Sequence, residues 1–192
     1  MDCKVICFVG PSGVGKTSYA KRLMKKYNFI FPSVVVTRKQ RSDDDECYLY
    51  VNESTFIEMV NSGRFIEWDK YSNYYYGTLL QSVEEIKRLG YHSGIVLDLT
   101  PNGCRGVKRA IPDAIIIALL PDNPEWLYER LKGRSSQPLE EIRARTNLLR
   151  SYLDEIELLA CKKVYASFSP DSWNQTFKEI EDIIFKSTIM CG

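Results

Sequence analysis

Histidine is nearly absent from this chain of 192 residues, in which His92 is the one representative. The cysteines form no Cys-x-x-Cys pair and stand apart at Cys3, Cys7, Cys47, Cys104, Cys161 and Cys191. A zinc site built from closely spaced histidine and cysteine ligands is therefore not expected. Because scattered cysteines in a chain of this size do not make a disulfide framework, we expect reduced thiols in a cytoplasmic protein.

Long apolar runs and an excess of one charge sign are also missing. The longest apolar run, residues 114–120, is far shorter than the roughly 18 residues that a membrane span requires, and we expect no targeting segment. Lys and Arg total 26 and Asp and Glu total 25, so the formal net charge is +1. We therefore expect no membrane and no nucleic-acid polymer as a partner, although net charge does not exclude a local cluster that binds an anion.

The composition that is present is that of a folded globular protein, with 44% hydrophobic and 27% charged residues. Apolar strand patterns occur at residues 5–9, 31–36, 94–99 and 114–120 and near residue 164. Helical patterns alternate with them at residues 16–27, 82–90, 103–110, 123–133, 139–160 and 172–185, and a capping box starts the second of these at residues 82–85. This alternation predicts one α/β domain in which helices flank both faces of a parallel sheet.

Residues 38–80 interrupt the alternation with a polar, tyrosine-rich stretch. One short helical pattern within it is capped by Asn52 and ended by Gly63. Strand-like pieces lie around Tyr48 and at residues 65–68. We interpret the stretch as an insert folded over the carboxyl edge of the sheet.

The first strand pattern is followed by a complete G-x-x-x-x-G-K-[ST] motif, formed by Gly10, Pro11, Ser12, Gly13, Val14, Gly15, Lys16 and Thr17. Its glycines let backbone N–H groups point at phosphate oxygens, and the following helix adds its positive N-terminal end. Lys16 is placed to reach the β- and γ-phosphates, and Thr17 to hold Mg²⁺. The motif predicts a P-loop NTPase-type sheet that binds a nucleoside triphosphate, but it does not identify the second substrate.

Other residues point to that second substrate. Arg38 and Arg41 follow the second strand pattern and can contact another phosphate. Glu67 lies among apolar residues and can accept two hydrogen bonds from a planar base with adjacent N–H donors, as in guanine. A basic stretch at residues 130–134, followed by Arg145, is a candidate for a mobile lid.

In their order along the chain these motifs resemble the guanylate kinase family, from about residue 4 to residue 185. The resemblance implies the reaction ATP + GMP ⇌ ADP + GDP, with Mg²⁺. It also implies a single domain whose parts are a core at residues 1–37, 81–132 and 146–192, a monophosphate-binding insert at 38–80 and a small lid at 133–145.

The same resemblance implies a role for individual residues. The phosphate of GMP would be held by Arg38, Arg41, Tyr48 and Tyr76. Guanine would be read by Glu67 and Thr78. ATP would be bound by residues 10–17 with Arg130 and Arg134, and the catalytic residues would be Lys16, Arg134 and Arg145. Asp98 would orient Mg²⁺ through water, next to Thr17.

Several features depart from the family pattern, and three of them concern the acceptor site. Val34 stands where the family usually has a serine that donates to the acceptor phosphate. Thr100 replaces the second acid of an Asp-x-Asp strand end, and that acid helps to read guanine. A shorter acidic stretch at residues 42–46 replaces a glycine-containing loop, and we interpret residues 43–46 as a solvated turn.

These departures leave two functions open besides the phosphorylation of GMP or dGMP. One is a kinase of another nucleoside monophosphate or small phosphorylated acceptor, for which Val34 and Thr100 would set specificity. The other is a catalytically silent guanylate kinase-like module that binds a protein, although the complete phosphate loop with Lys16 and Thr17 argues against it. We expect ATP and GMP or dGMP as partners, and a monomer or weak homodimer.

Overall fold

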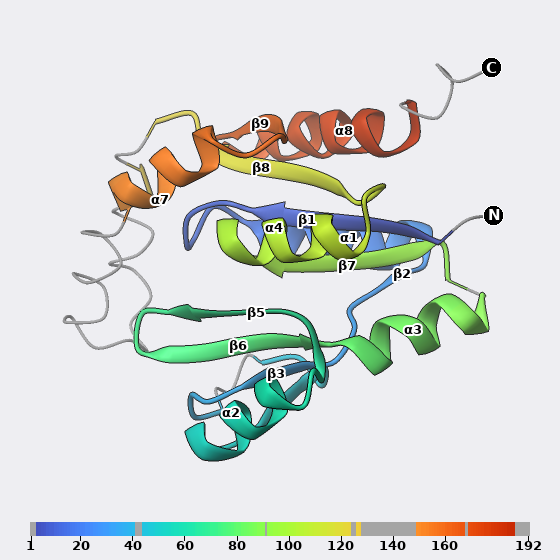
Figure 1. Ribbon diagram of the computed structural model, residues 1–192. Helices are drawn as coiled ribbons and strands as arrows, with labels where there is room; N and C mark the ends of the chain where they lie inside the picture. Colours follow the sequence, from blue (N-terminus) through green and yellow to red (C-terminus); the bar gives the residue numbers. More distant parts are fainter. Residues whose placement is uncertain are drawn as a thin grey trace.

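The computed structural model describes residues 3–40, 44–90, 92–123, 126–127, 149–167 and 169–186. Two sheets form its framework, and Figure 1 shows them as separate layers. The core sheet has the strand order β2 (Phe29–Ile30), β7 (Gly94–Leu99), β1 (Lys4–Val9), β8 (Ile115–Pro121) and β9 (Lys162–Ala166). All of its strand pairs are parallel, as the sequence predicts.

The central strand β1 is buried on both faces, which is why it is apolar at every position from Val5 to Val9. Its odd-numbered side chains pack with α3 (Leu80–Leu89), α4 (Pro101–Ala110) and α7 (Leu149–Glu157). Its even-numbered side chains pack with α1 (Lys16–Tyr27) and α8 (Pro170–Lys186). Each fully buried side chain of this size stabilises the fold by about 1.5–3 kcal/mol, so the two apolar cores fix the sheet between its helices.

The order of the strands reverses at β1. The chain leaves β1 through α1 and continues at the β2 edge, whereas β8 and β9 lie on the other side of β1. Parallel sheets bind ligands outside the carboxyl ends of their strands at such a switch point. The glycine-rich loop that follows β1 therefore lies where this architecture places a ligand.

The second sheet is built from β4 (Tyr48–Tyr50), β3 (Val34–Val36), β6 (Tyr74–Leu79) and β5 (Phe65–Tyr71), in that order. Between β4 and β5 the chain forms α2 (Glu53–Asn61). The predicted start of α2 is confirmed, because the Asn52 side chain accepts a hydrogen bond from the backbone N–H of Thr55 at 2.9 Å. Gly63 follows the helix with a φ of 63°, a conformation that glycine adopts without strain.

The prediction of one strand over residues 31–36 is wrong. The chain instead makes β2, which pairs with β7 in the core sheet, and then β3, which pairs with β4 and β6 in the second sheet. Pro32 lies between the two strands and has no N–H to donate to a ladder. The proline therefore marks the point at which the chain passes from one sheet to the other.

The starts of α3 and α4 also differ from the prediction. Helix α3 begins at Leu80, before the expected capping box, and the Ser82 hydroxyl instead accepts a hydrogen bond from the backbone N–H of Ser33 at 2.9 Å. Helix α4 begins at Pro101, because Thr100 caps it by accepting from the N–H of Gly103 and proline fits the first turn.

The remaining elements follow the expected order. Helix α8 starts two residues earlier than predicted, and α7 is the described part of the helix expected at residues 139–160. Of the helix expected at residues 123–133, the structure describes residues 126–127 as helical. Cys3, Cys7, Cys47, Cys104 and Cys161 are free thiols, and none of the described helices is long and apolar enough to cross a membrane.

Candidate active site

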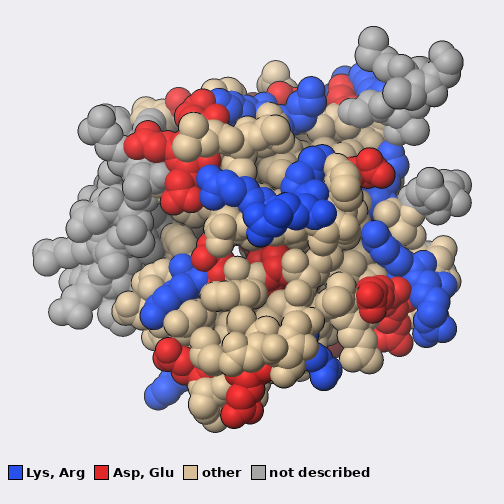
Figure 2. Space-filling view, in the orientation of Figure 1, with Lys and Arg blue, Asp and Glu red and all other residues tan. Residues whose placement is uncertain are grey.

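A cleft of about 220 Å³ lies between the carboxyl ends of the core strands and the second sheet. Figure 2 shows this face hollowed between the two layers, with acidic side chains at the hollow and a band of basic side chains above it. The cleft is lined from the core by Gly10, Ser12, Lys16, Thr17, Asp98 and Thr100. From the second sheet and its loops it is lined by Val34, Arg38, Tyr48, Glu67, Asp69, Tyr76 and Thr78.

The glycine-rich loop has the conformation that its sequence predicts. Gly10, Gly13 and Gly15 all have positive φ angles, of 155°, 90° and 103°. A Cβ atom at Gly10 would lie 2.2 Å from the carbonyl oxygen of Leu119, so no side chain fits there. Val14 is buried and anchors the loop, which leads directly into α1, where loop N–H groups and the positive end of a helix form a phosphate cradle.

Lys16 is held at the mouth of this loop. Its Nζ donates to the carbonyl oxygens of Gly10 at 2.8 Å and Pro11 at 3.2 Å, and it lies 3.6 Å from Oδ1 of Asp98. The lysine side chain is only 12% exposed. Asp98 is the one exposed residue of β7 and lies next to the last residue of the strand. The ammonium group is therefore positioned beside the cradle before any phosphate arrives.

Thr17 and Asp98 form the second polar pair at this end of the cleft. The Thr17 hydroxyl donates to Oδ2 of Asp98 at 3.2 Å. A hydroxyl and a carboxylate are hard oxygen donors of the kind that Mg²⁺ uses together with waters and substrate phosphates. No group of three or more His, Cys, Asp or Glu side chains able to hold a metal exists among the described residues.

Arg38 lies in the opposite wall of the cleft and is almost fully buried. Its Nη1 and Nη2 donate to the two carboxylate oxygens of Asp44, each at 2.6 Å, and Tyr50 donates to the same carboxylate at 2.6 Å. Within the described parts of the chain its Nε has no hydrogen-bond partner. The guanidinium is thus held by Asp44 through Nη1 and Nη2, while its Nε–H remains as a donor. Such an arginine is suited to bind an anion, for example a phosphate oxygen.

Two tyrosines surround this guanidinium. The ring of Tyr48 lies 5.3 Å from Cζ of Arg38, and Tyr76 lines the same part of the cleft. Burial raises the pKa of Tyr48, so its hydroxyl stays protonated and able to donate a hydrogen bond. The three sequence-predicted phosphate ligands that the structure describes therefore lie together, on β3, β4 and β6 or next to them.

Glu67 faces the cleft from β5 and is paired with Thr78 on β6. Its Oε1 accepts from the Thr78 hydroxyl at 2.6 Å and from the Thr78 N–H at 3.1 Å. Burial raises the pKa of Glu67 to about 7, against the opposing effect of the two Thr78 hydrogen bonds and with a contribution from the negative charge of Asp69. The nearby Lys70 does not pair with Glu67 and lies instead over the ring of Tyr75.

Two glycines of α4 make room for Glu67. A Cβ atom at Gly103 would lie 2.6 Å from Oε2 of Glu67, and one at Gly106 would lie 3.0 Å from the Glu67 Cβ. Because these glycines are one turn apart, they lie on the same face of α4, and the absence of side chains there lets β5 pack closely against the helix. They were not predicted as site residues, although two glycines at this spacing in a helix are an unusual signal.

The expectation of a solvated acidic turn at residues 43–46 is wrong for Asp44, whose side chain is only 8% exposed because it is paired with Arg38. Asp45 forms a more exposed ion pair with Lys21 of α1 at 2.8 Å. Sequence reasoning also missed Tyr152 of α7, which lines the cleft and donates from its hydroxyl to the carbonyl of Leu99 at 3.4 Å.

Arg41, Arg130, Arg134 and Arg145 all lie outside the described residues, as does the lid at residues 133–145. Their predicted roles remain predictions.

A phosphate-binding loop at the switch point of a parallel sheet, facing a second sheet across one cleft, defines a P-loop α/β nucleotide-binding protein. The family model described as "Guanylate kinase" matches residues 2–187. The chain therefore belongs to the guanylate kinase family.

Individual relatives agree with this assignment. The chain is 33% identical over 184 residues to a guanylate kinase of Prochlorococcus marinus (strain MIT 9313), and the match covers 94% of both chains. It is 35% identical over 152 residues to a guanylate kinase of Mycoplasma mobile, covering 74% of this chain and 75% of the relative. The crystal structure of guanylate kinase from Anaplasma phagocytophilum has the same fold, with a TM-score of 0.71 and 19% identity over 98% of this chain and 88% of its own.

Proposed function

We propose that this chain is a guanylate kinase, which transfers the γ-phosphoryl group of Mg-ATP to GMP or dGMP. The observation that supports this proposal is that residues suited to both substrates line the same cleft. Lys16 and Thr17 of the phosphate loop lie on its core side, and Arg38 and the Glu67–Thr78 pair lie on the other. A triphosphate and a phosphorylated guanine nucleotide can therefore bind face to face, with their reacting groups between the two walls.

On the donor side, the loop N–H groups would hold the β-phosphate and Lys16 would bind the β- and γ-phosphates. To do so, the lysine exchanges the carbonyls of Gly10 and Pro11 for phosphate oxygens. Thr17 and Asp98 would hold Mg²⁺, which when bound neutralises developing charge on the phosphoryl oxygens.

On the acceptor side, the orphaned Nε edge of Arg38 would bind the GMP phosphate together with Tyr48 and Tyr76. Glu67 would accept two hydrogen bonds from the N1–H and N2–H groups of guanine, and Thr78 would hold that carboxylate in place. The attacking phosphate oxygen is already anionic, so the chemistry needs positioning and charge compensation rather than a strong general base.

We further propose that residues 38–80 move as an acceptor-binding unit and that residues 133–145 form a lid. Arg134 and Arg145 would then compensate charge on the transferring group. Closure would exclude water, which otherwise hydrolyses ATP. The Lys21–Asp45 ion pair connects α1 to the loop before β4, and as an exposed pair it is weak enough to break when the unit moves.

The test is GDP formation from GMP and Mg-ATP by the wild-type chain and by two lysine variants on α1. Lys16→Ala should lose GDP formation by at least about 10³-fold, because it removes a charge that stabilises the transition state. Lys25→Ala removes an exposed lysine from the same helix and should leave turnover unchanged. Wild-type turnover that survives in Lys16→Ala would contradict the assignment of the phosphate loop as the donor site.

A second candidate is a kinase of another nucleoside monophosphate. It is favoured by Val34 and Thr100, which both line the cleft and both depart from the family pattern. A panel of acceptors distinguishes the two candidates directly.

A further inference from the structure

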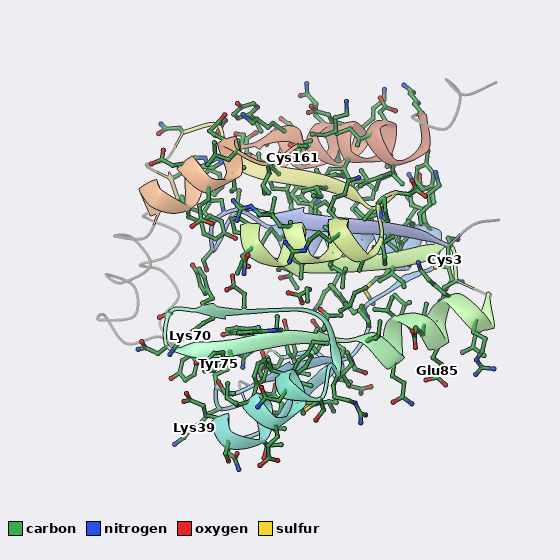
Figure 3. The ribbon with its side chains drawn as sticks, viewed as in Figure 1. Cys3, Lys39, Lys70, Tyr75, Glu85 and Cys161 are labelled. Carbon is green, nitrogen blue, oxygen red and sulfur yellow. The ribbon has the colours of Figure 1, made fainter. Side chains whose placement is uncertain are left out.

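Asp69 is an acid in the cleft to which neither the sequence nor the family pattern assigned a role. Along β5, Glu67, Asp69 and Tyr71 all line the cleft, as alternate residues of a strand must when one of them does. The intervening residues lie on the opposite face, where Trp68 contacts Phe56 and Lys70 lies over the ring of Tyr75, as Figure 3 shows for the latter pair. Asp69 is thus the next side chain after Glu67 on the guanine-facing side of the strand.

Asp69 is also attached to Thr100, the position at which the family pattern has an acid. The Thr100 hydroxyl donates to Oδ2 of Asp69 at 2.5 Å and accepts from the N–H of Gly103 at 3.1 Å. Because its single proton is given to Asp69, Thr100 cannot donate to a ligand as well. The second sheet therefore brings a carboxylate from β5 into contact with Thr100, the residue that follows β7 and stands where the family pattern has an acid.

The Asp69 carboxylate retains capacity for a ligand. Its Oδ1 accepts from the N–H of Lys70 at 2.8 Å and from Nδ2 of Asn102 at 3.4 Å, and its Oδ2 accepts from Thr100. An ionised carboxylate offers about four acceptor positions, so one remains on Oδ2. No Lys or Arg among the described residues forms an ion pair with Asp69.

We propose that Asp69 is the second guanine-reading acid of this chain, in place of the acid that Thr100 replaces. The proposal rests on the proposed function. Guanine carries three donors on one edge, the N1–H and the two hydrogens of the N2 amino group. Glu67 takes N1–H and one N2 hydrogen, and Asp69 takes the other N2 hydrogen.

Inosine monophosphate, which lacks the N2 amino group, separates this contact from general effects on the acceptor site. We measure KM and Kd for GMP and for inosine monophosphate in wild type, Asp69→Asn and Glu58→Gln, the last being an exposed acid of α2 as a matched control. Asp69→Asn should weaken GMP binding by roughly 10-fold or more, since it removes a charge-assisted hydrogen bond. Binding of inosine monophosphate should be unchanged, so that the preference for GMP falls by the same factor.

A relocation variant tests the same idea by rescue. Asp69→Ala combined with Thr100→Asp moves the carboxylate from β5 to the end of β7, where aspartate can still cap α4. The double variant should recover most of the preference for GMP that Asp69→Ala alone loses. Recovery also shows that the loss in the single variant is not a failure to fold.

An unchanged preference for GMP in Asp69→Asn, or equal losses for both nucleotides, would overturn the role of Asp69 and leave the kinase assignment intact. A wild-type chain that forms no GDP would instead overturn the proposed function and this inference with it. The Asp69→Asn variant therefore tests this inference, and the wild-type chain tests the proposed function.

Discussion

The carboxylate of Asp44 binds the guanidinium of Arg38 through both of its oxygens, at 2.6 Å each, with both side chains less than 10% exposed. Tyr50 donates to the same carboxylate and fixes its orientation. Arg38 is therefore fixed in the wall of the cleft at which we propose that the acceptor phosphate binds, and its Nε has no hydrogen-bond partner among the described residues. Preorganisation of this kind reduces the free energy that binding must spend on ordering side chains.

Breaking this pair should destabilise the protein. Asp44→Asn leaves a buried guanidinium without its counter-charge, so the free energy of unfolding should fall by about 3 kcal/mol. Urea unfolding measures this. Asp45→Asn is the matched control in the same loop, because its ion pair with Lys21 is exposed and contributes less than about 1 kcal/mol. Equal losses in the two variants would show that Asp44 does not hold Arg38 in solution.

Gly103→Ala should damage guanine recognition through Glu67. A Cβ atom at this position would lie 2.6 Å from Oε2 of Glu67, so the carboxylate must move. We expect the KM for GMP to rise by about 10- to 100-fold, as for other small displacements of positioning groups, with the KM for ATP unchanged. Gly106→Ala, whose contact is with the Glu67 Cβ at 3.0 Å, should have a smaller effect. An alanine at residue 103 with normal GMP kinetics would mean that the carboxylate is not confined by α4.

Recognition of GMP should weaken as the pH falls below neutrality. Burial raises the pKa of Glu67 to about 7, so a growing fraction of this carboxyl is protonated between pH 8 and pH 6 and loses an acceptor oxygen. At pH 6 about nine tenths of the free protein carries neutral Glu67, and the KM for GMP should be roughly 10-fold higher than at pH 8. Steady-state kinetics at the two pH values measure the change.

The phosphate of GMP itself titrates near pH 6, so the comparison requires a variant without the carboxyl. Glu67→Gln should have a high KM at both pH values and should lack the additional 10-fold change. If the variant and the wild type show the same pH dependence, Glu67 is not the titrating group.

Glu67 should also make the free protein less stable at high pH. Its folded-state pKa of about 7 lies above the ordinary value of 4.5, so the folded state binds more protons than the unfolded state between these values. Stability is therefore highest below pH 4.5 as far as this group is concerned and is lost as the pH rises through 7. The full loss is about 3 kcal/mol, so Glu67→Gln should exceed the wild type by up to that amount at pH 8 and match it near pH 4.5. Urea unfolding that gives the same difference at both pH values would contradict the raised pKa.

The parallel sheet and the phosphate loop could be predicted because their signals are local. Residues 5–9 are apolar at every position and Gly10 to Thr17 match the motif in full, so strand, loop and helix follow from short-range physics. Arg38 and Glu67 stand out by their charge and their place in the sequence, and the family resemblance adds Tyr48, Tyr76 and Thr78. The structure brings these five residues into one cleft.

The partners of these residues could not be predicted, because they come from distant segments. The Asp44 charge was interpreted as solvated since an acidic turn usually is, and only the folded chain shows that it is buried against Arg38. The contact between Asp69 and Thr100 joins residues 31 positions apart. The division of residues 29–36 between two sheets likewise depends on pairing with β7 and β6, which no local pattern encodes.

The measurement that tests the central claim most directly is ADP formation from Mg-ATP with GMP, dGMP, AMP, UMP, CMP or buffer alone. Strong stimulation by GMP or dGMP and little by the other monophosphates is the predicted result, because the Glu67 carboxylate, which Thr78 holds in place, is proposed to accept from the donor edge of guanine. Equal or greater stimulation by another monophosphate, or no stimulation by any acceptor in a chain that binds ATP, would contradict the account.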